Sequence, residues 1–189
     1  MFVRTARHWF PELNHKRFLP FLLAFVLPLL AVYAWWGGFN PVMIGVQMRG
    51  PYTYAYVEHT GDYAKLADQL PRVREALARA GIEPGAAISL LYSHPDRVAR
   101  SERRARVGYL VAPGTSAPPS LQLDTLPVRR VLIARVRAAM PLAPSRAYQA
   151  LDDHLKREGK SITLPSVELY EASGSIFKPG LFTVELESP

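Results

Sequence analysis

The stretch ADQLPRVREALARAG at residues 67–81 and the stretch SRAYQALDDHLKREG at residues 145–159 decide the fold. In both, apolar residues recur three or four positions apart, which is the spacing of one face of an amphipathic helix. Both end in glycine, Gly81 and Gly159, the residue type that most often follows the last turn of a helix. We therefore expect two helices that are related by a constant offset of 78 residues.

The same offset relates further positions of the chain. The superposed pairs are Val73 with Leu151, Leu77 with Leu155, and Tyr92 with Tyr170. Because the agreement covers helix, cap and strand without a gap, it indicates an internal duplication.

Strands are expected on both sides of each helix. Tyr52, Tyr54 and Tyr56 alternate with other residues, which is the period of a β-strand. The predicted strands are residues 52–57, 87–92, 106–111, 130–137, 166–170 and 182–186. We therefore predict an α+β fold in which two duplicated βαββ units form one mainly antiparallel sheet, with two helices on one face and a groove on the free face.

Residues 18–36, FLPFLLAFVLPLLAVYAWW, carry no charge. A helix of this length rises about 28 Å, close to the thickness of a hydrocarbon core. The segment therefore predicts a single transmembrane helix, a signal anchor, with a kink at Pro28. A cleaved signal peptide is the alternative, because Val32 and Ala34 are small residues at the spacing of a cleavage site.

The flanks of this segment predict an orientation. Four basic residues, Arg4, Arg7, Lys16 and Arg17, precede it, and the first charge after it is Arg49. The positive-inside rule then places the N-terminus in the cytoplasm and the domain on the extracytoplasmic side, periplasmic in a bacterium. The expected divisions are a cytoplasmic segment at 1–17, the membrane helix at 18–36, a linker at 37–44, and a domain at 45–188 with halves at 45–112 and 127–188.

Composition excludes several kinds of site. The chain has no cysteine, which rules out disulfides and thiolate zinc sites. His59 and His94 lack a third ligand in the sequence pattern, so neither a metal nor a cofactor is expected. The net charge is +7, but residues 45–189 hold 19 basic against 15 acidic residues without a nucleic-acid-binding motif. No nucleic-acid partner is expected.

Three motifs resemble those of the GyrI-like small-molecule-binding domain, which is found in gyrase-inhibitor proteins and in multidrug-responsive transcription regulators. Residues 58–66, EHTGDYAKL, resemble its strand-to-helix signature, with Asp62 in place of a proline. Residues 88–96, ISLLYSHPD, resemble its tyrosine segment with the closing Asp-Pro inverted. Residues 165–170, PSVELY, resemble its closing motif, a Glu two residues before a Tyr. The similarity spans residues 45–188, although residues 138–145 lack the family's Gly-x-Tyr element.

The resemblance implies a ligand site around Glu168. In the strand at 166–170, Glu168 and Tyr170 point to one face and Val167 and Leu169 to the other, and we expect the latter face to meet the helices. Glu168 then faces the groove and supplies its charge, with tyrosines as aromatic walls for a cation. The expected ligand-binding residues are Glu168, Tyr170, Tyr92, Tyr54 and Tyr56, and no residue is assigned as catalytic. The alternative for Glu168 is a solvated side chain or an ion pair with Arg135 or Arg137.

These features favour a membrane-anchored, non-enzymatic domain that binds a small cationic or amphiphilic molecule. One alternative is a hydrolase of small electrophilic compounds that uses Glu168, an activity that the resemblance implies for some family members. Another is a membrane-tethered protein-interaction module. The expected partners are the lipid bilayer, the small molecule and a membrane protein.

Overall fold

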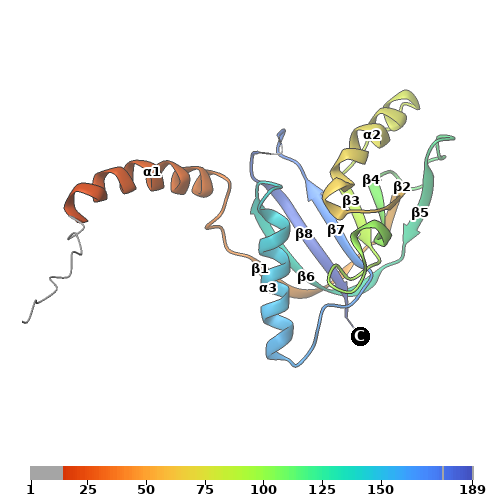
Figure 1. Ribbon diagram of the computed structural model, residues 1–189. Coiled ribbons are helices and arrows are strands. Elements are labelled where there is room, and N and C mark those ends of the chain that lie inside the picture. Colours follow the sequence, from red (N-terminus) through yellow and green to blue (C-terminus); the bar gives the residue numbers. More distant parts are fainter. Residues whose placement is uncertain (1–14, 176, 189) are drawn as a thin grey trace, which may run out of the picture.

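The computed structural model describes residues 15–175 and 177–188 (Figure 1). The α-helices are α1 (His15–Trp35), α2 (Leu70–Arg79) and α3 (Ala143–Arg157), and the 3-10 helices are η1 (Tyr63–Gln69) and η2 (Arg100–Glu102). The strands are β1 (Met43–Arg49), β2 (Tyr52–Thr60), β3 (Ala87–Leu91), β4 (Arg104–Leu110), β5 (Gln122–Leu126), β6 (Arg129–Ala138), β7 (Ser166–Glu171) and β8 (Gly180–Glu187).

All eight described strands form one antiparallel sheet in the order β1-β6-β8-β7-β3-β4-β2-β5. The first half contains β1 to β4 and the second half β5 to β8, so the counterparts are β1 and β5, β2 and β6, β3 and β7, and β4 and β8. Exchanging each strand for its counterpart gives the same strand order in reverse. The repeat is therefore ββαββ, and its two-fold axis passes between the central strands β3 and β7. Each half gives its first strand to the other half, because β1 pairs with β6 and β5 pairs with β2.

The predicted fold of two βαββ units behind a membrane helix is wrong in its strand count. β1 and β5 were not predicted, because both are edge strands whose exposed side chains do not alternate between apolar and polar. β1 also contains Gly45, a residue that weakens strands. An edge strand needs no buried face, so its sequence lacks the alternating apolar pattern by which strands are predicted.

The predicted membrane helix is also corrected. In the part of the chain that the structure describes, no helix combines the length and the apolar character needed to cross a membrane. This finding overturns the transmembrane helix at 18–36, the signal anchor, the single-pass localisation with an extracytoplasmic domain, and the bilayer and membrane-protein partners. Residues 1–14 lie outside the described residues.

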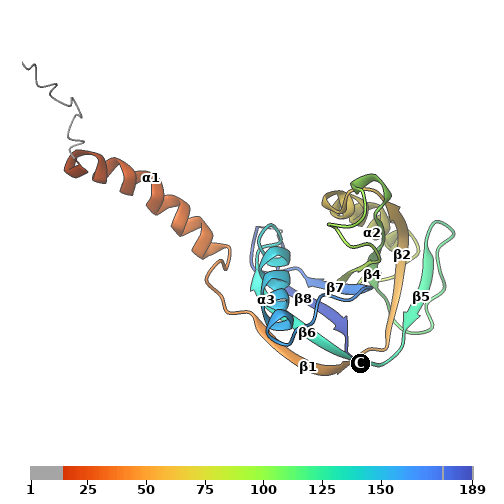
Figure 2. The same cartoon turned by 60° about the horizontal axis from the view of Figure 1, so that its bottom comes forward.

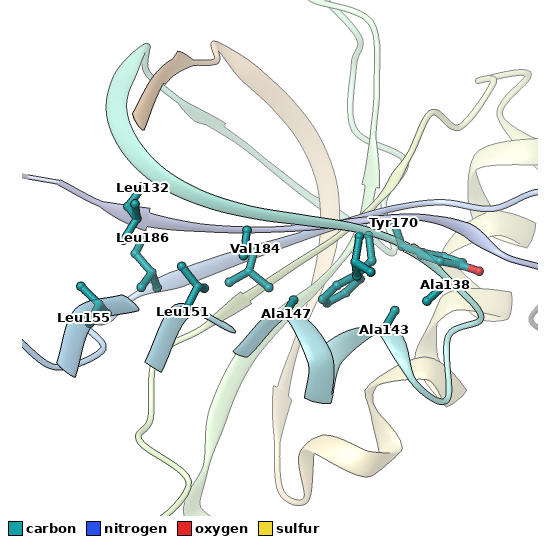
Figure 3. Packing of buried hydrophobic residues seen from close by; sticks show 12 residues of the cluster. Leu132, Ala138, Ala143, Ala147, Leu151, Leu155, Tyr170, Val184 and Leu186 are labelled. Atoms are coloured by element: carbon teal, nitrogen blue, oxygen red, sulfur yellow. The ribbon is translucent and has the colours of Figure 1, made fainter. Parts of the chain in front are cut away.

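Helices α2 and α3 lie on one face of the sheet, each over the outer strands of its own half. α3 packs on β6 and β8, and α2 packs on β4 and β2. Figure 3 shows the apolar stripe Ala143, Ala147, Leu151 and Leu155 of α3 against Leu132, Val184 and Leu186 of the sheet. Because the helices sit over the flanks, the central strands β3 and β7 remain uncovered between them (Figure 1).

The opposite face is closed by the curl of the sheet. Figure 2 shows the chain running from β1 directly into β2 beneath the other strands. Gly50 makes this crossing with a φ of 99°, and a Cβ there would lie 2.8 Å from the carbonyl oxygen of Pro127 in the β5–β6 link. The buried cluster on this face contains Tyr54, Tyr56, Ile88, Leu90, Val167 and Leu169. The protein's own side chains therefore occupy the centre of the face where a groove was predicted.

A buried carboxylate holds this curl together. Glu185 of β8 is 1% exposed and accepts hydrogen bonds from Arg49 Nε at 2.9 Å, Arg129 Nη2 at 2.7 Å and the Tyr52 hydroxyl at 2.7 Å. These partners come from β1, β6 and β2. The single carboxylate thus ties together four strands from both halves.

Replacing Glu185 with Gln should destabilise the domain by roughly 3 kcal/mol, because it leaves two half-buried guanidinium groups without a counter-charge. Urea denaturation measures the change. Glu187→Gln, at an exposed position on the same strand, is the control and should shift the midpoint little. Equal midpoints for both variants would contradict the structural role of Glu185.

Candidate functional site

A cavity of about 310 Å³ lies over the uncovered centre of the sheet. It is bounded by η1 and α2 on one side and by the segment before α3 on the other. Its lining residues are Ala67, Leu70, Pro71, Arg74, Ala87, Ser89, Tyr109, Met140, Glu168, Tyr170 and Phe182. The lining is mainly apolar and contains two charged side chains, Glu168 on the sheet and Arg74 on α2.

Glu168 occupies the floor of this cavity. It lies on β7 opposite Ser89 of β3, and both line the cavity. Arg135 and Arg137 point to the other face of the sheet, because their neighbours Ala134 and Val136 pack against α3. Among the described residues, no basic side chain forms an ion pair with Glu168.

Burial controls the protonation of Glu168. Loss of solvation raises the pKa of its carboxyl from 4.5 to about 7, and a hydrogen bond from Tyr148 of α3 partly opposes this rise. The Tyr148 hydroxyl also lies 3.0 Å from Ser166 Oγ, so α3 holds it beside the carboxyl. The site therefore contains a carboxyl that changes charge near neutral pH.

Two tyrosines lie in the row of paired residues that crosses the strands next to Glu168, on the same face of the sheet. Tyr170, Ala87 and Tyr109 lie side by side on β7, β3 and β4. Tyr170 is 9% exposed. Burial raises the pKa of its hydroxyl, and a hydrogen bond from the backbone of Gly180 partly opposes this rise. Figure 3 shows this ring near Ala138 and Ala143. Aromatic faces and a tyrosine hydroxyl thus adjoin the carboxyl.

A second hollow, of about 560 Å³, continues the cavity along this row. It shares Leu70, Arg74, Ala87, Tyr109 and Tyr170 with the first cavity. It extends to the β7–β8 connection at Ala172, Gly174 and Ser175. The two hollows form one elongated depression between α2 and that connection.

The structure separates the residues that were predicted to share a site. Glu168 and Tyr170 line the cavity, on the face that carries the helices. Val167 and Leu169 pack with Tyr54 on the other face, so the expected orientation of this strand is reversed. The alternation along the strand was correct, but apolarity did not identify the helix face because both faces are buried.

Tyr54, Tyr56 and Tyr92 instead surround Arg106 on the opposite face. The Arg106 guanidinium lies 4.6 Å from the Tyr56 ring centre and 5.7 Å from that of Tyr92. It also donates to the Tyr54 hydroxyl at 3.3 Å and to Asp124 at 2.6 Å. A cation from the protein itself therefore occupies these aromatic faces.

The offset of 78 residues explains why Tyr92 was misplaced. It relates the helices correctly, pairing Leu70 with Tyr148 at the two sides of the central strands. In the strands it pairs Glu168 with Leu90, which lies on the opposite face from Glu168. A shift of one residue moves a strand side chain to the other face of the sheet. The number of residues between helix and strand therefore differs between the two halves by an odd number.

Tyr148, Tyr109 and Arg74 were not predicted as site residues. Tyr148 precedes Leu151 by three positions, which places it beside the buried stripe of α3. That spacing was visible in the sequence. Arg74 and Tyr109 carried no signal, since their proximity depends on how α2 lies over β4.

Comparison with known proteins identifies the fold. No protein-family profile matches the chain, and no curated protein sequence matches it. EcmrR in its complex with DNA matches with a TM-score of 0.61 and 10% identity, covering 92% of this chain and 67% of EcmrR. The EcmrR C-terminal domain matches with a TM-score of 0.60 and 11% identity, covering 77% of this chain and 96% of that domain.

SAV2435 bound to tetraphenylphosphonium matches with a TM-score of 0.55 and 12% identity, covering 77% of this chain and 93% of SAV2435. Identities this low show the fold alone, and that fold is the GyrI-like effector-binding fold. The prediction of no nucleic-acid partner is corrected, because one protein with this fold is in complex with DNA.

The carboxyl of Glu168 should make stability depend on pH. Its pKa is higher in the folded chain than in the unfolded chain, so the folded state retains the proton longer as pH rises. Its contribution is therefore fully present below about pH 4.5 and is lost as pH rises through 7. Glu168→Gln should remove this dependence and stabilise the protein above pH 7 by up to roughly 3 kcal/mol. Urea denaturation from pH 4 to 9 checks this, and parallel profiles for variant and wild type would refute it.

Proposed function

We propose that the domain at residues 45–188 binds small organic cations in the cavity, where the Glu168 carboxylate supplies the counter-charge. The observation that carries the proposal is this carboxyl on the floor of an apolar cavity, without a basic partner among the described residues. A buried ionised carboxylate is costly in free energy, and a bound cation offsets that cost. A bound cation would therefore supply the counter-charge that an ionised Glu168 lacks among the described residues.

The walls of the cavity suit the same ligand class. Tyr109, Tyr170 and Phe182 present aromatic surface beside Glu168. Aromatic faces attract cations, and this attraction strengthens where water is excluded. The cavity volume also falls in the range of small-molecule sites.

A structural neighbour supports the proposal. SAV2435, which shares the fold, was determined with tetraphenylphosphonium, a lipophilic cation. Of the predicted ligand residues, we retain Glu168 and Tyr170. We leave out Tyr54, Tyr56 and Tyr92, because they surround Arg106 and its positive charge disfavours a second cation there.

Calorimetry should show that the full chain binds tetraphenylphosphonium and does not bind tetraphenylborate, an anion of nearly the same shape. Affinity for the cation should be about tenfold higher at pH 8 than at pH 6, because only protein molecules in which Glu168 is ionised bind the cation. Glu168→Gln should abolish both the binding and the pH dependence, and Glu187→Gln should retain them. Binding of both ions with equal affinity would refute the role of the charge.

Tyr148→Phe provides a second test of the same site. It removes the hydrogen bond that lowers the Glu168 pKa, so the midpoint of the pH dependence should move to higher pH. An unchanged midpoint would show that another group controls the titration.

Hydrolysis of small electrophilic compounds is the second candidate function. A carboxyl with a pKa near 7 beside the Tyr148 hydroxyl is suited to proton transfer at neutral pH. Turnover of a chromogenic ester that is lost in Glu168→Gln and retained in Glu187→Gln would favour it. Equal rates in both variants would exclude Glu168 as the catalytic group.

A further inference from the structure

Arg74 places a second charge on the cavity, at its mouth. The side chain is exposed on α2, and its guanidinium lies 5.0 Å from the Tyr109 ring centre. Its Nε donates a hydrogen bond to the Tyr109 hydroxyl at 3.3 Å. No acidic residue of the described ranges forms an ion pair with Arg74. Its positive charge is therefore available to a molecule in the cavity.

The sheet fixes the spacing between the two charges. Tyr109, beneath Arg74, lies in the row of Ala87 and Tyr170, and Glu168 lies one row away on the same face. Adjacent rows on one face are about 7 Å apart along the strand, and β4 is two strands from β7, about 10 Å across the sheet. The carboxylate and the guanidinium thus lie on the order of 10 Å apart along the cavity.

The surface between the charges is elongated and can accept an apolar chain. Leu70, Ala87 and Tyr170 lie along it, and the second hollow extends it toward the β7–β8 connection. An elongated, mainly apolar path with opposite charges at its ends is complementary to an elongated molecule with opposite charges at its own ends.

Building on the proposed function, we infer that the site selects a bipolar amphiphile: an organic cation at Glu168, joined by an apolar spacer of roughly 10 Å to an anionic group at Arg74. A cation without that group leaves Arg74 as a like charge near the site, which opposes its binding. An anionic group at the mouth converts this repulsion into attraction. The added ion pair is partly exposed, so its effect on affinity is moderate.

The test compares ω-trimethylammonio-octanoate with octyltrimethylammonium, which has the same chain length without the carboxylate. Calorimetry on the full chain at pH 8 and low salt should give the zwitterion an affinity about five- to tenfold higher. Arg74→Gln should remove this advantage. Arg72→Gln, at an exposed arginine of the same helix outside the cavity, should preserve it.

The outcomes separate the inference from the proposed function. If octyltrimethylammonium binds as tightly as the zwitterion, or if Arg74→Gln keeps the zwitterion's advantage, the inference is overturned and cation binding at Glu168 stands. If neither compound binds, and tetraphenylphosphonium does not bind either, the inference and the proposed function are both overturned. Loss of the advantage in Arg72→Gln as well as Arg74→Gln would assign it to the net charge of α2 and would also overturn the inference.

Discussion

The antiparallel pairing of β3 with β7 determines where the cavity of this structure lies. This pair joins the two halves in a fixed register, with Ser89 opposite Glu168 and Ala87 opposite Tyr170. Each half brings its own helix over its own outer strands, so the pair at the junction stays uncovered. A duplicated fold of this kind creates a cavity on its own axis, and the residues on these two strands form the floor.

The two halves differ where the cavity needs an asymmetric site. Glu168 faces Ser89 across the axis, so one half contributes a carboxyl and the other a small hydroxyl. On the helices, Tyr148 is the counterpart of Leu70, which puts a hydrogen-bond donor on one side and an apolar wall on the other. The curl of the sheet around Glu185 leaves the remaining face filled by side chains. The fully buried Glu185 and the partly buried Glu168 therefore differ, since Glu185 has two arginine partners and Glu168 has none among the described residues.

Part of this arrangement could be predicted from the sequence. The helical spacing and the two glycines located α2 and α3, and the alternation around Glu168 and Tyr170 correctly put both on one face. The choice of face failed, because Val167 and Leu169 are as buried as residues beneath a helix, although they pack against Tyr54. β1 and β5 gave no pattern because edge strands bury little side-chain surface. The proximity of Arg74 to Tyr109 depends on tertiary packing, which the local sequence does not encode.

Our proposal requires that Glu168, a partly buried carboxyl on the floor of the cavity, lacks a counter-charge until a cation binds. Its direct test is an NMR titration of the side-chain carboxyl in protein labelled at glutamate, without ligand and with saturating tetraphenylphosphonium. The account predicts a pKa near 7 in the free protein and a fall of at least one unit in the complex, because a nearby cation stabilises the ionised form. A pKa near 4.5 in the free protein, or a value that does not change on saturation, would contradict it.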